Sequence, residues 1–157
     1  MKNLKQLLKQ PLKAVPSSII IFLLIVALIG FVDASYLTIE HFRGVIPPCT
    51  VTSDCGLVLT SSYSVIYGMP MSLLGAIYYL TILVGLFAYL DTKNAKILKW
   101  TLLITIFGLL ASLSLIYVQV FVLYSYCLYC IISATVSVVL FISAMEVLEK
   151  YRMIESK

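Results

Sequence analysis

Long apolar runs separated by short polar segments dominate the pattern along this chain. Four runs are long enough to cross a membrane as helices, which takes about 20 residues each. They cover roughly residues 17–36, 69–90, 97–124 and 127–148. The pattern therefore predicts an all-α integral membrane protein. We expect a bundle of four transmembrane helices, with residues 1–157 forming a single membrane domain.

The one long connection lies between the first and second runs, at residues 42–68. Pro47 and Pro48 oppose a helix there, since proline lacks a backbone N–H and restricts the residue before it. Residues 57–67 are partly apolar but too short to span a bilayer. We expect them to form a helix or turn in the membrane interface, as a lid over the bundle.

Composition and charge support a membrane protein and give it an orientation. The chain is 62% hydrophobic and 11% charged. Ten of its eleven basic residues lie at the ends of the runs that share one side, and only Arg43 lies on the other. The ten are Lys2, Lys5, Lys9, Lys13, Lys93, Lys96, Lys99, Lys150, Arg152 and Lys157. The positive-inside rule then predicts a multi-pass protein of the cell membrane, with both termini in the cytoplasm. The net charge gives no indication of nucleic-acid binding.

Cys127 and Cys130 form a C-x-x-C pair where the third run ends and the fourth begins. In a helix starting at Cys127 the two sulfurs share a face, with Cys130 about 4.5 Å deeper. A helix N-terminus lowers the pKa of a thiol because its free N–H groups favour the thiolate. We expect Cys127 to face water-borne chemistry and Cys130 to face lipid. A structural disulfide or two inert buried thiols are the alternatives.

The other two cysteines, Cys49 and Cys55, lie in the long connection, so all four are predicted on the outer face. A zinc site is disfavoured because such sites usually show C-x2-C twice. A c-type haem needs histidine after the C-x-x-C, where Ile131 stands. Two hypotheses remain for the four cysteines. They form static disulfides in a membrane interaction or scaffold protein without turnover, or they form a relay of thiol–disulfide exchange.

The order and spacing of these motifs resemble the vitamin K epoxide reductase family, and its prokaryotic branch most. The resemblance covers about residues 17–148. It rests on Ala34 to Thr38, Cys49, Asp54-Cys55, Val58 with Ser61 to Tyr63, Gly68-x-Pro70-x-Ser72-x-x-Gly75, and the final C-x-x-C.

The resemblance implies a membrane thiol oxidoreductase with four redox-active cysteines. Cys49 would exchange with the thiols of a partner, and Cys55 would pass the electrons to Cys127. Cys130 would react with a quinone held among the four helices. The protein would thereby support disulfide formation outside the cytoplasm.

The same resemblance implies a quinone pocket. Ser61 and Tyr63 would shape or cap it, and Met71 and Ala134 occupy the places where vertebrate members carry an asparagine and a tyrosine that contact vitamin K. A ubiquinone or menaquinone type of acceptor is therefore expected rather than an epoxide. The expected partner is a separate thioredoxin-like redox protein.

Three polar residues lie outside these motifs, and their roles are considered separately. Asp33 near the end of the first run either reaches interfacial water or is a buried functional carboxylate. His41, the single histidine, is either solvated or a proton relay. Gln119 in the third run is expected to hydrogen-bond within the bundle.

Overall fold

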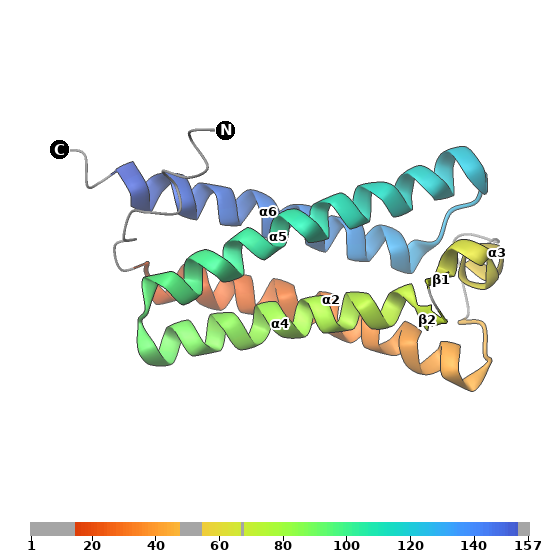
Figure 1. Cartoon of the computed structure of the whole chain (residues 1–157), viewed down its shortest axis with the longest axis horizontal. Helices are drawn as coiled ribbons and strands as arrows, with labels where there is room; N and C mark the ends of the chain where they lie inside the picture. The colour runs from red at the N-terminus through yellow and green to blue at the C-terminus, as the bar shows by residue number, and fades with distance from the viewer. Residues whose placement is uncertain (1–14, 48–54, 67, 154–157) are drawn as a thin grey trace.

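The computed structural model describes residues 15–47, 55–66 and 68–153, and within them four long helices form the body of the protein (Figure 1). These are α2 (Ser17–Arg43), α4 (Met71–Thr92), α5 (Ala95–Tyr117) and α6 (Leu128–Met153). All four stretches are long and apolar enough to cross a membrane. The predicted all-α membrane architecture is confirmed.

Helix α2 continues seven residues beyond the apolar run that ends at Tyr36. It ends at Gly44, whose left-handed backbone (φ 66°) lets its N–H donate to the carbonyls of Glu40 and His41. Glycine adopts this conformation without a Cβ penalty. The hydropathy pattern therefore gives the apolar part of the helix, whereas the glycine sets its end.

The third long helix changes its winding before it ends. α5 passes directly into the π-helix η2 (Val118–Val122), and the chain then turns at Tyr124, where φ is 49°. A π-helix is uncommon and is frequently found at functional sites. Apolar periodicity did not predict this change, because the apolar run continues through it to Tyr124.

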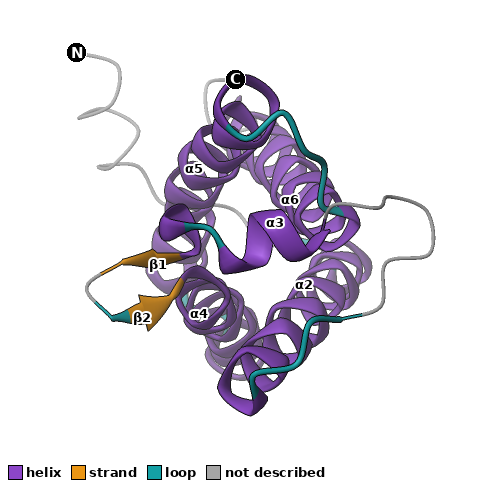
Figure 2. Cartoon of the chain, turned by 90° about the vertical axis from the view of Figure 1, so that its right-hand side faces the viewer, coloured by secondary structure: helices purple, strands orange, loops and turns teal. Residues whose placement is uncertain are grey.

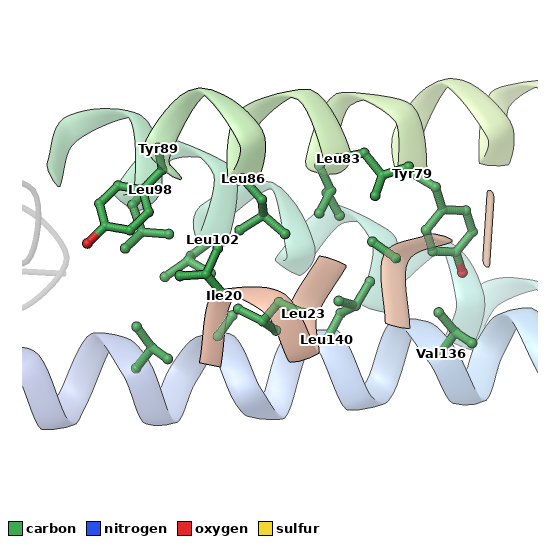
Figure 3. Packing of buried hydrophobic residues seen from close by; sticks show 14 of the residues in the cluster. Ile20, Leu23, Tyr79, Leu83, Leu86, Tyr89, Leu98, Leu102, Val136 and Leu140 are labelled. Atoms are coloured by element: carbon green, nitrogen blue, oxygen red, sulfur yellow. The ribbon is translucent and has the colours of Figure 1, made fainter. Parts of the chain in front are cut away.

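The four helices stand in a ring in the order α2, α4, α5, α6 (Figure 2). Away from the end of the ring where residues 55–66 lie, fully buried side chains from all four helices fill the ring (Figure 3). Examples are Ile20 of α2, Leu86 of α4, Leu98 of α5 and Leu140 of α6. Many large apolar side chains on the outer surface are exposed, which suits a surface covered by lipid.

Small residues let neighbouring helices approach closely. A Cβ on Gly30 of α2 would overlap the ring of Tyr79 of α4. A Cβ on Gly85 of α4 would overlap Thr101 of α5. Such contacts of glycine with a larger partner are typical of membrane helix packing.

The helix or turn predicted at residues 57–67 is a helix only in its first part, as α3 (Cys55–Thr60), which begins two residues earlier than predicted and lies across the end of the ring (Figure 2). It is followed by the short 3-10 helix η1 (Ser62–Ser64) and by two paired strands, β1 (Val65–Ile66) and β2 (Met69–Pro70). We call residues 55–66 the lid. The strands were not predicted. They end at Pro70, whose extended backbone precedes α4, so this helix begins at Met71 rather than at 69.

Candidate active site

Cys127 and Cys130 lie at the start of α6, as predicted, and both are free thiols. The carbonyl of Cys127 accepts a hydrogen bond from the N–H of Ile131 at 3.1 Å, so Cys127 is the capping residue just before the helix. Its side chain is 0% exposed, so the expectation that Cys127 faces water is wrong. The reason is the lid, which covers this thiol. Cys130 is half-buried and lines an internal cavity.

The lid brings a third cysteine to this pair. Cys55 begins α3, is 1% exposed, and shares a buried cluster with Val58 and Cys127. Cys55 is disulfide-bonded, whereas the C-x-x-C pair is reduced. Cys49 lies outside the described residues. The fold therefore brings Cys55 and the C-x-x-C pair together in one buried cluster at the end of the bundle.

The surroundings of Cys127 favour its thiolate. A hydrogen bond from the Cys130 thiol lowers the pKa of Cys127 from 9.0 to about 7, against the opposing effect of burial. The backbone N–H groups of Cys130 and Tyr129, at the free start of α6, lower the pKa further. Cys127 is thus both a ready nucleophile and a good leaving group in exchange with another sulfur.

Gln119 hydrogen-bonds the segment that leads into α6, which confirms the expectation that it hydrogen-bonds within the bundle. Its side chain is 2% exposed and lies in the π-helix η2. The Oε1 atom accepts from the backbone N–H of Cys127 at 3.1 Å, and the backbone carbonyl of Gln119 accepts from the N–H of Ser125. The side chain also hydrogen-bonds Cys130.

A cavity of about 800 Å³ opens beside Cys130, with walls from all four long helices and the lid. Its lining includes the four residues predicted for the cofactor pocket, Ser61, Tyr63, Met71 and Ala134. Ser61 uses its hydroxyl to donate to the carbonyl of Val58 at 2.8 Å. The side chain of Tyr63 is about half exposed although it lines the cavity.

Two buried polar atoms in the cavity wall lack a hydrogen-bond partner in the described part of the chain: Oδ2 of Asp33 and the hydroxyl of Tyr78. Asp33 is half-buried, and its Oδ2 atom is the part that is fully buried in the cavity wall. The neighbouring Tyr79, by contrast, donates to the carbonyl of Ser133 at 2.9 Å and lies 3.0 Å from the hydroxyl of Ser137. Buried polar groups are rarely left unpaired, so the unpaired atoms suit a ligand.

The sequence model of the vitamin K epoxide reductase family matches residues 21–145. The chain belongs to this family. No curated protein matches it significantly. Membership of the vitamin K epoxide reductase family makes the chain a membrane thiol oxidoreductase, and the family is generally quinone-linked.

Sequence reasoning missed Tyr78 as a cavity residue and left Asp33 open. For Asp33 the sequence did carry a signal. An acidic residue within a span is a functional candidate by default. Tyr78 had no such signal, since tyrosines are numerous in this chain and the sequence does not tell which ones face inward.

Proposed function

We propose that this protein oxidises an exported, separate thioredoxin-like protein and passes the electrons to a membrane quinone of the ubiquinone or menaquinone type. It would thereby support disulfide formation outside the cytoplasm, as a member of the prokaryotic branch. One observation carries the proposal. Cys130 belongs to the thiol pair beneath the lid cysteine and also lines the cavity among the helices.

The electron path has four sulfurs. The partner's dithiol reduces the loop disulfide of Cys49 and Cys55, becoming a disulfide itself. Cys55 then attacks Cys127 of an oxidised C-x-x-C pair, and the sulfur of Cys130 leaves as a thiolate. Attack of Cys49 on Cys55 restores the loop disulfide and releases Cys127, so that the pair holds two electrons.

The described structure corresponds to the state after the last of these exchange steps. Cys55 is in a disulfide while Cys127 and Cys130 are free thiols. Oxidation of this pair to a disulfide releases two electrons and two protons. A quinone held in the cavity would supply the acceptor for these two electrons and two protons by reduction to a quinol, so the reaction would balance.

The cavity suits a quinone head in size and chemistry. Its volume of about 800 Å³ lies within the range of small-molecule pockets, and its walls are mainly apolar with a few polar groups. The hydroxyl of Tyr78 is available to donate to a carbonyl oxygen, and Asp33 is available to transfer a proton at Oδ2. Ser61 and Tyr63 would close the cavity from the lid, with Met71 and Ala134 in its wall.

Orientation follows from charge. The start of α2, the α4–α5 turn and the end of α6 lie at one end of the bundle, and the lid lies at the other (Figure 1). The basic residues at the first end support a cytoplasmic location for it. A thiol reagent that cannot cross membranes should then label Cys49 in intact cells after mild reduction. Labelling only after the inner face is opened would overturn the orientation.

The test of the relay uses two double variants. Cys49→Ser with Cys130→Ser leaves Cys55 and Cys127 as the only thiols, and these should oxidise to a disulfide that mass spectrometry finds between lid and α6. Cys49→Ser with Cys127→Ser is the matched control and should crosslink much more slowly, because Cys130 faces the cavity. Free thiols in the first variant, in folded protein under oxidising conditions, would reject the relay and favour a scaffold with static disulfides.

A further inference from the structure

Gln119 is a buried polar side chain that contacts both residues of the thiol pair and that the proposed relay does not use. Its Oε1 accepts from the N–H of Cys127, and its side chain hydrogen-bonds Cys130. Both contacts come from one turn of π-helix, eight residues before Cys127. They lie in a nearly dry environment, because Gln119 is 2% and Cys127 0% exposed.

The two ends of the Gln119 amide fix its chemistry. The amide oxygen is only an acceptor, and here it is occupied by the N–H of Cys127. The amide nitrogen is only a donor, so the bond to Cys130 runs from nitrogen to sulfur. With its sulfur already accepting, Cys130 keeps its S–H for Cys127, and this is the hydrogen bond that favours the Cys127 thiolate.

The π-helix explains how Gln119 reaches the pair. In the π-helix the N–H of Leu123 donates to the carbonyl of Val118 at 2.9 Å, one residue further back than in an α-helix. The carbonyl of Gln119 is then available to the N–H of Ser125, which holds the connection to α6. The same turn therefore shapes the connection and aims the side chain at the thiols.

We propose that Gln119 is a positioning residue of the redox pair, which fixes Cys127 at the start of α6 and orients the Cys130 thiol toward the Cys127 sulfur. This rests on the proposed role of the pair in turnover. The test measures the ionisation of the Cys127 thiol. The role of Gln119 can therefore be rejected while the proposed quinone reduction is retained.

The experiment uses the full chain with Cys49→Ser and Cys55→Ser, purified in detergent and reduced. Alkylation of Cys127 by iodoacetamide is followed from pH 5 to pH 10, with the site identified by mass spectrometry. Burial of Cys127 makes reaction depend on opening of the lid, which lowers the rate at every pH without moving the midpoint of the profile. The midpoint therefore reports the thiolate of Cys127.

Gln119→Leu removes both contacts. The midpoint should move by about one pH unit to the alkaline side, so that the alkylation rate at pH 6 falls about tenfold. Gln119→Glu keeps an acceptor for the N–H of Cys127 but replaces the donor with a negative charge, and it should move the midpoint in the same direction. Ser114→Ala, at an exposed position of α5 whose hydroxyl donates to the Leu110 carbonyl, should leave the profile unchanged.

Gln119→Glu keeps the test decisive if Gln119→Leu does not fold. An unchanged midpoint in either folded Gln119 variant would overturn the proposal. So would an equal shift in Ser114→Ala, because the shift would then report general loosening of α5. A fall in alkylation rate by the same factor at every pH would also overturn it, since that result reports access rather than the thiolate.

Discussion

The two ends of the bundle are built from the same kinds of residue but differ in their interiors. At the end away from the lid, side chains such as Leu86, Leu98 and Leu140 fill the ring and are at most 1% exposed. At the lid end the same helices enclose a cavity of about 800 Å³, where polar atoms of Asp33 and Tyr78 have no hydrogen-bond partner among the residues that the structure describes. One end is a packed core, and the other is a space for a ligand.

The difference shows how a small membrane protein combines stability with chemistry. Interhelical packing, rather than hydrophobic exclusion from water, holds membrane helices together. Dense packing at one end lets the same four helices separate around a cavity at the other. Tyr79 marks the boundary, since it is packed against Gly30 while its hydroxyl reaches the Ser133 carbonyl next to the cavity.

The largest effect is expected in the packed end. Leu140→Ala should lower the free energy of unfolding by about 2–5 kcal/mol, because it leaves a cavity where neighbours cannot collapse. Reversible unfolding in detergent measures it. Leu110→Ala is the matched control, at a side chain that is 56% exposed, and should change stability by less than about 1 kcal/mol. Equal losses of stability would mean that the buried interior of the packed end contributes no more to stability than the exposed outer face of the bundle.

The next largest effect concerns pH. Since the pKa of Cys127 is lowered to about 7, its thiolate predominates above that pH and is lost as the pH falls below it. Cys130→Ala in the chain with Cys49→Ser and Cys55→Ser removes the main cause. The midpoint of Cys127 alkylation should then rise toward 9.0, with up to about a hundredfold less thiolate at pH 6. A midpoint that stays near 7 would assign the effect to the helix start alone.

These expectations also show what the sequence could predict. Apolar runs were enough to predict four spans. Cysteine spacing with the family resemblance singled out Cys55, Cys127 and Cys130, which the fold brings together, and four of the residues that line the cavity, whereas their roles stay predictions. Burial of Cys127 was not predictable, because it depends on α3 lying across the ring. The contact of Gln119 with Cys127 depends on a π-helix whose hydrogen bonds leave no mark on hydropathy.

The third prediction concerns the cavity at the lid end. Ala134→Leu places a larger apolar side chain in the cavity wall, where there is room for it, so stability should change by less than about 1.5 kcal/mol. The KM for a soluble quinone analogue should rise about tenfold or more, while reaction of the reduced partner with the loop is unchanged. An unaltered KM would place the quinone elsewhere.

The smallest effect lies at the boundary between the two ends. Tyr79→Phe keeps the ring against Gly30 but loses the hydrogen bond to Ser133, which should cost about 1 kcal/mol of unfolding free energy. Tyr89→Phe is the control at the packed end, where the hydroxyl accepts from the N–H of Val15 at 3.0 Å. Both variants should lose similar stability, but only Tyr79→Phe should alter the KM for quinone. A change in both would remove the distinction between the ends.

In the proposed function, electrons pass from a protein dithiol through the C-x-x-C pair to a quinone. The most direct measurement supplies purified protein with a reduced thioredoxin-like protein and a quinone, and follows quinol and partner disulfide together. We predict one quinol for each disulfide formed, and none above background with Cys130→Ser, although that variant should still trap the partner on Cys49 as a mixed disulfide. Undiminished quinol formation by Cys130→Ser would show that Cys130 does not deliver the electrons, and partner oxidation without quinol would show that a quinone is not the acceptor.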